Sequence, residues 1–468
     1  MESNTQKLNL KREVGLIGGV SFIAGTMIGS GIFISPQFVL AAIGSPGASF
    51  VIWTLCGLIS MLGGLCYAEL GTVIPESGGE FIYILRTTGK VMAFMFSFSF
   101  IVVMRPASAT GIALSFAEYV VAPFYSGCTP PQLVVKCVAA ATILGLTFVN
   151  CLSVRLGTGI QVVSMVFKLG ALALIILGGV VMLFQGHTEN FEKSFENTNA
   201  EISSIGIAFY QGLWSFDGWN TLNYLTEELK HPEVNLPRAV VIAISLVTGL
   251  YLLVNVSYLT VMTPKELMSS SAVAVTWGNK VLGSWGWIMS VAAALSAFGS
   301  LNGTFFSGGR VCFVAAREGH LPDILAMAHV RRLTPSPALI FTTVVSLLVL
   351  IPGDFQNIVN FFSFTAWFFY GITLSGLVYL KIKKPELPRP YKVPIIIPIL
   401  VIIVAIFLVL APIIDNPQIE YLYVSLFILS GAIVYIPFIH YKLCPGLLTK
   451  LTVFLQLFLE VAPAEKNL

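Results

Sequence analysis

The chain has 468 residues, of which 56% are hydrophobic and only 10% are Asp, Glu, Lys or Arg. Soluble globular proteins carry about 25% charged residues, so this composition excludes a set of soluble domains. The net charge of +3 gives no indication of nucleic-acid binding, because the basic residues sit in short loops rather than on one face, and no nucleic-acid partner is expected. The composition predicts an integral membrane protein.

Apolar runs recur from one end of the chain to the other, and most are long enough to cross a hydrocarbon layer about 30 Å thick. They predict twelve transmembrane helices, at residues 14–36, 47–74, 91–122, 133–152, 159–184, 203–226, 239–262, 285–313, 337–352, 356–380, 393–413 and 420–441. The division between the ninth and tenth spans rests on Pro352, Gly353 and Asp354, which favour a turn. The polar segment Met1–Glu13 and the length of the first apolar run predict no cleavable signal peptide.

The distribution of basic residues between loops predicts which side of the membrane each loop faces. Loops on one side contain Lys136, Lys193, Lys265 and Lys280, whereas most of the 26 Lys and Arg residues lie on the other side. Because Lys and Arg are enriched in cytoplasmic loops, both termini are expected in the cytoplasm. The apolar stretch Thr449–Val461 is too short to span and is expected to lie as a helix at the membrane surface.

Two spans contain glycine and polar residues at mid-depth, where a regular helix is weakened. The first span contains Gly25–Phe33 (GTMIGSGIF) and the sixth contains Trp214–Asn220 (WSFDGWN). Each glycine weakens a helix by about 1 kcal/mol relative to alanine, and backbone that leaves the helix must line a cavity or be buried in protein. Interruptions five spans apart indicate an inverted-repeat transporter, and the free N–H and C=O groups at such breaks suit an amino acid. The alternative is that these glycines only permit close helix packing.

Asp217, Lys168 and Arg105 lie deep in predicted spans, where a buried charge is costly and a functional role is the first interpretation. Asp217, in the sixth-span break, is expected to bind the side-chain cation of a substrate; the alternative is a protonated or lysine-paired structural aspartate. Lys168, in the fifth span, is expected to place its ammonium group where a sodium ion would bind in a sodium-coupled relative. A structural pair with Asp217 or with helix-end carbonyl groups is the other interpretation of Lys168, and the two are compatible.

Arg105 and Trp214 each have a structural and a functional interpretation. Arg105 precedes Pro106, which removes a helical hydrogen bond, and the arginine is expected either to support the freed carbonyl groups or to lie beside the substrate. Trp214 is expected either to close over the bound substrate or to pack in the core. Since the chain has 34 Phe, 15 Tyr and 7 Trp, packing is the ordinary role of any single aromatic residue.

The seven cysteines and five histidines show no metal-ligand spacing, and no nucleotide-binding loop or nucleophile motif is present. No metal or cofactor is therefore expected. Cys128 lies in a predicted extracellular loop, and an intermolecular disulfide and a free thiol are the two alternatives for its sulfur. The spans show no ring of charges as in a channel and no paired carboxylates or histidines as in a membrane enzyme. An amino acid transporter is the favoured function, and a sensor that binds without transport remains an alternative.

Five motifs together resemble the light subunits of heteromeric amino acid transporters, which belong to the amino acid–polyamine–organocation superfamily. They are Gly25–Phe33 (GTMIGSGIF), Glu76–Glu80 (ESGGE), Ser215–Asn220 (SFDGWN), Thr226–Leu229 (TEEL) and Arg331–Pro335 (RRLTP). The resemblance extends over nearly the whole chain, from about residue 11 to residue 463. It is strongest to the b(0,+)-type subunits, which exchange cationic amino acids and cystine for neutral ones.

The resemblance implies an all-α membrane fold of the LeuT-like type, with two inverted five-helix repeats, two further helices, and broken first and sixth helices. It divides the chain into a cytoplasmic N-terminus (1–13), two repeats (14–184 and 203–380), two final spans (393–441) and a cytoplasmic tail with an interfacial helix (442–468). It also implies sodium-independent exchange by alternating access across the plasma membrane, and an apical position in epithelia is compatible with it.

The resemblance also implies site residues and partners. Substrate-binding roles carry over to Ile28, Gly29, Ser30, Gly31, Trp214, Ser215 and Asp217, and the role of sodium-site substitute carries over to Lys168. Cys128 would form a disulfide with a single-span glycoprotein heavy subunit, an rBAT-like or related heavy chain. The implied partners are thus amino acid substrates, this heavy subunit and the lipid bilayer.

Two short segments depart from the b(0,+) pattern and affect the expected substrate range. The chain has Arg105-Pro106-Ala107 where those subunits have Lys-Pro-Thr, and Ser215-Phe216 where they have Ala-Tyr. A lost hydroxyl near the site removes a hydrogen bond worth about 0.5–1.5 kcal/mol. Arg105 and Ala107 are therefore selectivity candidates, and Asn220, at the end of the sixth-span break, is a third. An aromatic- or neutral-preferring exchanger without arginine or cystine transport is the alternative.

Overall fold

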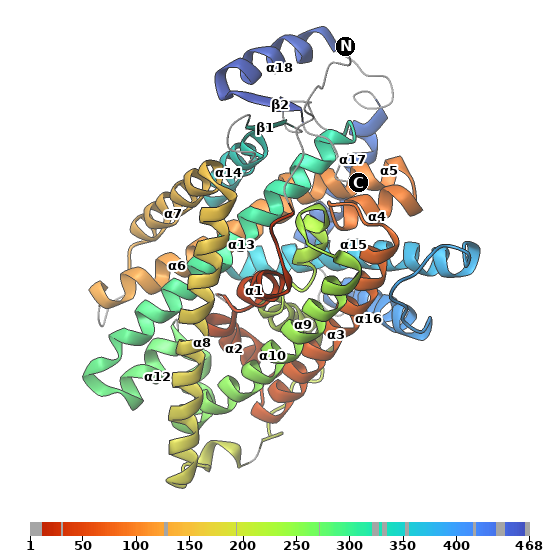
Figure 1. Cartoon of the computed structure of the whole chain (residues 1–468). Coiled ribbons are helices and arrows are strands. Elements are labelled where there is room, and N and C mark those ends of the chain that lie inside the picture. Colours follow the sequence, from red (N-terminus) through yellow and green to blue (C-terminus); the bar gives the residue numbers. More distant parts are fainter. Residues whose placement is uncertain are drawn as a thin grey trace.

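The computed structural model describes residues 12–29, 31–125, 130–192, 194–270, 272–320, 327–329, 335–351, 355–414, 418–436 and 445–463. These residues are almost entirely helical (Figure 1). The longer helices are α3 (Pro46–Val73), α6 (Arg105–Val121), α7 (Gln132–Leu152), α8 (Val154–Phe184), α10 (Pro232–Val261), α13 (Trp287–Arg317), α15 (Phe355–Lys383), α16 (Ile396–Ile414) and α17 (Ile419–Tyr435). The shorter ones are α1 (Leu16–Met27), α2 (Gly31–Ile43), α4 (Glu80–Thr87), α5 (Lys90–Ser99), α9 (Ile202–Ser215), α11 (Pro264–Ser269), α12 (Val273–Val281), α14 (Ser336–Leu350) and α18 (Pro445–Leu459).

Helices long and apolar enough to cross a membrane dominate the described chain. Eight qualify singly, and the pair α1 and α2, inclined by 42° at a short break, makes a ninth. Each of the twelve predicted spans overlaps a helix, and α9, α14 and α17 account for the shorter ones. The short helices α4, α11 and α12 occupy connections that were expected to be loops, so the predicted all-α membrane fold is confirmed with additional helices between its spans.

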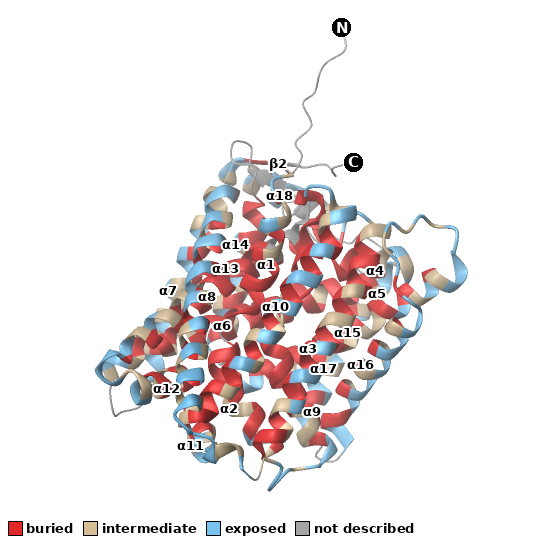
Figure 2. Cartoon of the chain, turned by 60° about the horizontal axis from the view of Figure 1, so that its bottom comes forward, coloured by how far each residue is buried: buried red, intermediate tan, exposed pale blue. Residues whose placement is uncertain are grey.

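The broken helices lie inside the bundle. α1 packs against α8, α10 and α13, while α2 packs against α9. α9 in turn contacts α3, α15 and α16. Figure 2 shows buried residues concentrated in the middle of the bundle and exposed residues along its periphery. The exposed residues on the outer helices include many large apolar side chains, such as Leu177, Leu400 and Leu422, as a lipid-facing surface requires.

Both predicted helix interruptions are present. α1 ends at Met27, Ile28 has extended backbone (φ −78°, ψ 91°), and α2 begins at Gly31. α9 ends at Ser215, and the chain turns before the 3₁₀ helix η4 (Thr221–Glu228). Gly218 has a φ of +109° in this turn, which a residue with a side chain rarely adopts. The glycines therefore produce real breaks in the helices rather than close packing alone.

Pro106 acts on its helix through a π-helical turn. The π-helix η1 (Phe100–Met104) joins α5 to α6, so the chain runs without interruption from Lys90 to Tyr125. Because Pro106 has no N–H, the helix cannot close its regular hydrogen bond at this point, and the wider turn accommodates the defect. Among the described residues, the Arg105 side chain donates no hydrogen bond to the freed carbonyl groups, so this part of the structural interpretation of Arg105 is wrong.

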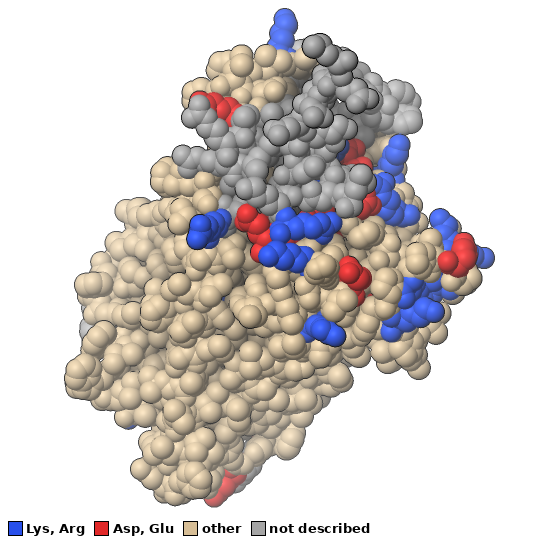
Figure 3. Space-filling model, viewed as in Figure 1, with Lys and Arg blue, Asp and Glu red and all other residues tan. Residues whose placement is uncertain are grey.

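Charged residues gather at one end of the bundle. On the face shown in Figure 3, the visible Lys and Arg gather below the α18 segment and along the side next to it, whereas the part of the bundle away from α18 is almost uncharged. At this end, strand β1 (Met327–His329) pairs antiparallel with β2 (Val461–Pro463), which follows α18. α11 lies at the opposite end (Figure 2). We refer to these as the α18 end and the α11 end.

Buried ion pairs close the α18 end. Arg317, the last residue of α13, makes a two-fold contact with Glu227 of η4, with N–O distances of 2.6 and 3.1 Å. Lys381 of α15 contacts Glu69 of α3 at 2.9 Å, and the Glu69 side chain is fully buried. At the same end, Val14 forms a backbone bridge to Leu229, the residue that follows η4. These contacts join the first, sixth and eighth spans to one another, and the second span to the tenth, at this end.

Candidate functional site

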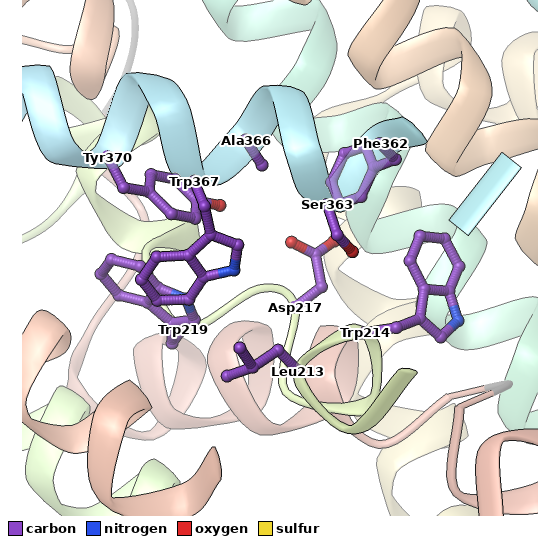
Figure 4. Close-up of a pocket in the computed structure, with 9 residues that line it drawn as sticks. All are labelled: Leu213, Trp214, Asp217, Trp219, Phe362, Ser363, Ala366, Trp367 and Tyr370. Atoms are coloured by element: carbon purple, nitrogen blue, oxygen red, sulfur yellow. The ribbon is translucent and has the colours of Figure 1, made fainter. Parts of the chain in front are cut away.

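A small cavity lies where the sixth-span break faces α15. It is lined by Leu213, Trp214, Asp217, Trp219, Phe362, Ser363, Ala366, Trp367 and Tyr370 (Figure 4). Its free volume is about 10 Å³, which holds one water molecule at most. The site is therefore closed in this conformation and must widen to admit an amino acid.

Asp217 supplies the carboxylate of this cavity. The residue sits directly after α9, and its backbone N–H donates to the carbonyl of Trp214 at 3.1 Å. Figure 4 shows its side chain directed toward α15 beside Ser363. No cation of the described chain lies within ion-pair distance of Asp217. A carboxylate without a paired cation, inside a closed cavity, is available to a positively charged ligand.

Aromatic rings form most of the cavity wall. Trp214 packs edge-on against Phe362, with ring centres 5.4 Å apart, and Trp219 packs against Tyr370 at 5.0 Å. Trp367 contacts Tyr370 at 5.1 Å. Such a wall suits the apolar part of a large side chain, and π faces also attract a cation.

The contribution of α15 to the site was missed by the sequence analysis. Phe362, Ser363, Ala366, Trp367 and Tyr370 share one face of this helix because they recur at spacings of three and four residues. Their segment is a run of aromatic and small residues without a charge. Nothing in that run distinguishes a cavity wall from ordinary core, so the signal was absent.

The predicted residues of the first break lie beside the cavity rather than in its wall. Ile28 is fully buried, and its carbonyl accepts from Ser296 at 3.4 Å. A Cβ atom at Gly29 would lie 2.3 Å from Ser300, and one at Gly31 would lie 2.6 Å from the Cα of Ser215. These glycines thus let the first break approach α13 and α9 closely. Ser30 lies outside the described residues.

Ser215 joins the two breaks. Tyr251 of α10 donates its hydroxyl proton toward two carbonyl groups, that of Ser215 at 2.7 Å and that of Met27. The Ser215 hydroxyl itself is buried and makes no hydrogen bond to the described residues. Of the seven predicted substrate residues, Trp214 and Asp217 line the cavity.

Lys168 reaches the first break from α8. Its ammonium group is fully buried and donates to the carbonyl of Gly25, near the end of α1. No ion pair joins Lys168 to Asp217 in the described chain. The interpretation in which the lysine holds a helix-end carbonyl is thus observed, and the paired-aspartate interpretation is wrong.

Arg105 is buried close to the site without a paired anion. Its guanidinium lies over the rings of Phe100 and Tyr224, at 4.7 and 5.5 Å from their centres. Its charge acts electrostatically on both Asp217 and Glu80, although neither carboxylate is within 4 Å among the described contacts. Arg105 thus places a fixed positive charge near the cavity.

Ala107 and Asn220, the remaining predicted residues that the structure describes, differ in their distance from the cavity. Ala107 is buried in α6 and does not line the cavity. Asn220 lies beneath the cavity, where its amide group donates to Glu80 and, at 3.1 Å, to the hydroxyl of Tyr224. Cys128 lies outside the described residues. The structure therefore brings Asn220 close to the site and leaves Ala107 apart from it.

Comparison with known proteins identifies the family. The family model described as "Amino acid permease" matches residues 15–438. The chain belongs to this family. It is an amino acid transporter and not an enzyme, as the sequence predicts.

Individual relatives match over nearly the whole chain. The b(0,+)-type amino acid transporter 1 of Homo sapiens is 50% identical over 461 residues, which cover 98% of this chain and 95% of the relative. The Large neutral amino acids transporter small subunit 2 of Mus musculus is 44% identical over 87% of this chain and 77% of its own length. The Cystine/glutamate transporter of Pongo abelii is 41% identical over 99% of this chain and 93% of its own length. The predicted resemblance to the b(0,+)-type light subunits is therefore confirmed.

Proposed function

We propose that this chain is the transporting subunit of a sodium-independent exchanger of cationic and large neutral amino acids. The observation that carries the proposal is Asp217, a carboxylate without a paired cation in a closed cavity of aromatic rings. The carboxylate attracts the distal cation of arginine or lysine, and the rings accept the alkyl stem or an apolar side chain. The relatives named for b(0,+)-type and large neutral amino acid transport support this substrate range.

The first break supplies the groups that recognise any α-amino acid. Backbone N–H groups at the start of α2 attract a carboxylate, and carbonyl groups at the end of α1 attract an ammonium group. Lys168 already fixes the carbonyl of Gly25 at that end. In our proposal, Ile28, Gly29, Ser30, Gly31 and Ser215 bind the part common to all substrates, and Asp217 reads the side chain.

The second candidate is an exchanger that prefers aromatic or neutral substrates. It is favoured by Arg105, whose buried positive charge lies near Asp217 and reduces the attraction of the site for a second cation. The substitution of a family threonine by Ala107 has less support, because Ala107 does not line the cavity. The two candidates differ in one property, the transport of arginine.

Uptake into proteoliposomes separates the candidates. We expect labelled arginine to enter leucine-loaded vesicles, but not empty ones, in sodium-free buffer. Asp217→Gly and Asp217→Asn should reduce arginine uptake about 10- to 100-fold, because a charge-assisted contact contributes about 1.5–3 kcal/mol, while leucine exchange continues. Glu118→Gln is the matched control, since it removes a carboxyl group near the C-terminal end of α6 that does not line the cavity. Entry of leucine or tyrosine without arginine would favour the second candidate.

We propose further that a disulfide at Cys128 links the chain to a single-span glycoprotein heavy subunit in the plasma membrane. In this proposal both termini and the α18 end face the cytoplasm. The Lys and Arg that gather below the α18 segment in Figure 3 support this orientation. The name of one relative, a small subunit, supports an assembly with a larger chain. The exposed apolar side chains Leu451, Phe454 and Phe458 support an interfacial position for α18.

The disulfide is tested by electrophoresis of the co-expressed subunits. Without reductant, the chain should migrate with the heavy subunit, and Cys128→Ser should release it at its own mass. Cys137→Ser, at an exposed cysteine of α7, should leave the linked band unchanged. A linked band that survives Cys128→Ser would exclude this bond.

A further inference from the structure

Another carboxylate, Glu80, lies beneath the cavity in the short helix α4, outside the membrane-spanning helices. It follows a turn in which Gly78 and Gly79 have φ values of +122° and +55°. A Cβ atom at Gly79 would lie 2.4 Å from the ring of Tyr224, so the turn is pressed against η4. Only glycine permits both this backbone and this approach.

Backbone contacts hold the turn to η4. The N–H of Gly79 donates to the carbonyl of Asn223 at 3.0 Å, and the N–H of Glu227 donates to the hydroxyl of Ser77 at 2.8 Å. Glu227 also makes the buried ion pair with Arg317 that closes the α18 end. Any movement of η4 that opens this end must therefore separate it from the turn or carry the turn along.

The Glu80 side chain connects three elements. It is fully buried, and its Oε1 accepts from the hydroxyl of Tyr67 at 3.2 Å and from the amide group of Asn220. Its Oε2 is buried and accepts no hydrogen bond from the described residues. The carboxyl group thus joins α3, α4 and the sixth-span break while one of its oxygens lacks a donor.

Glu80 is one layer away from the substrate cavity. The Tyr67 ring packs against Trp219 and Tyr370, with ring centres 4.7 and 6.2 Å apart, and both of these residues line the cavity. A change at Glu80 is therefore passed to the cavity through Tyr67 and Asn220, without contact between Glu80 and the substrate.

Few charges compensate this carboxyl group. The titratable side chains that act on it are Tyr67 of α3, Tyr83 of α4, Tyr224 of η4, Tyr370 of α15 and, as the cation, Arg105 of α6. Asp217 acts on the same Tyr370 from the cavity side. Burial raises the pKa of Glu80 from 4.5 to about 7, because the lowering effects of its own backbone N–H, of the Tyr224 and Tyr67 hydroxyl groups and of Arg105 are smaller.

We propose that Glu80 binds a proton in the conformation closed at the α18 end and releases it when η4 and α4 separate, so that protons slow the opening of this end. The proposal rests on the proposed function, since it assumes that the α18 end opens during exchange. Glu80 is a positioning residue, because it acts on the site through Tyr67 and Asn220.

The direction of the pH effect follows from the two states. In the closed state the pKa of Glu80 is about 7, and in water the carboxyl returns to the ordinary value of 4.5. The closed state therefore binds more protons between these values, and acidification favours it. Between about pH 8 and pH 6 the ratio of closed to open molecules rises about tenfold.

Another titratable group near α4 does not produce this effect. His320, which follows α13, packs against Phe81 with ring centres 5.1 Å apart. Burial lowers the pKa of His320 to about 4. This imidazole therefore stays neutral between pH 6 and pH 8.

Hydrogen–deuterium exchange of the intact heterodimer tests the proposal without measuring transport. We compare the backbone amides of the turn 77–80 and of η4 in the unsubstituted chain and in Glu80→Gln, at each of pH 6, 7 and 8. The difference between the two proteins at each pH removes the intrinsic pH dependence of amide exchange. Protection in the unsubstituted chain should rise about tenfold from pH 8 to pH 6 relative to Glu80→Gln. Parallel profiles of the two proteins would overturn the proposal.

Two further variants keep the test decisive if Glu80→Gln does not fold. Tyr67→Phe removes a donor that favours the ionised carboxyl, so it should move the midpoint of the protection profile to higher pH. Glu118→Gln, which alters a carboxyl away from this turn, should keep the unsubstituted profile. An unchanged midpoint in Tyr67→Phe would also overturn the proposal. If the unsubstituted heterodimer shows the expected pH dependence of protection but exchanges no amino acid in proteoliposomes, that result contradicts the proposed function and not the role of Glu80.

Discussion

At the scale of single residues, the deep charges have separate tasks. Asp217 faces the cavity, Lys168 holds the end of α1, and Arg105 lies over aromatic rings. Sequence reasoning identified all three, because an ionisable residue inside an apolar span is rare and conspicuous. It named helix-end carbonyl groups as one partner of Lys168, but it did not identify Gly25 or the rings beneath Arg105, since a carbonyl group or an aromatic ring leaves no distinctive mark in the sequence.

Truncation of Lys168 tests whether its ammonium group is needed at the first break. Lys168→Ala leaves the carbonyl of Gly25 without its buried donor, which costs about 1–3 kcal/mol. We expect amino acid exchange in proteoliposomes to fall at least about fivefold, in the presence or absence of sodium.

Lys136→Ala is the matched control. Lys136 also donates to a helix-end carbonyl, that of Ile351 at 2.6 Å, but it is exposed at the end of α7. Its removal should leave exchange unchanged. Normal exchange by Lys168→Ala, or an equal loss in both variants, would refute the assigned role of Lys168.

At the scale of elements, the two broken helices and their close approach organise the site. The breaks were predicted because glycine and polar residues at mid-depth are incompatible with a regular helix in lipid. α4 and the cavity face of α15 were not predicted. The first is an eight-residue, largely apolar helix that is too short to span a membrane, and the second has the composition of ordinary core.

Gly31→Ala tests the contact between the breaks. The added Cβ would lie 2.6 Å from the Cα of Ser215, a backbone atom that cannot turn aside. Overpacking of this kind costs about 1–3 kcal/mol, so the purified heterodimer should unfold at a lower temperature and exchange more slowly.

Gly249→Ala provides the comparison within a helix. Gly249 lies in α10 with no atom within 4 Å of an added Cβ, and alanine favours a helix by about 1 kcal/mol over glycine. Its unfolding temperature should stay equal or rise. Equal destabilisation by both alanines would show that the approach of Gly31 to Ser215 is not what limits stability.

At the scale of the whole molecule, the structure is closed around its site. The cavity of about 10 Å³ excludes an amino acid, and buried pairs such as Glu227–Arg317 close the α18 end. Composition and periodicity suffice to predict the all-α membrane fold, because lipid admits few spanning structures. The contacts that close the ends depend on residues far apart in the chain, such as Val14 and Leu229, and no local pattern announces them.

The central claim is that the chain exchanges one amino acid for another through the site at Asp217. The most direct measurement is the efflux of labelled leucine from proteoliposomes that contain the heterodimer, into sodium-free buffer with or without arginine. The account predicts that efflux begins only when arginine is added, and that arginine loses this effect in Asp217→Gly while external leucine keeps it. Equal efflux into buffer without amino acids would contradict obligatory exchange, and an unchanged arginine response in Asp217→Gly would contradict the site.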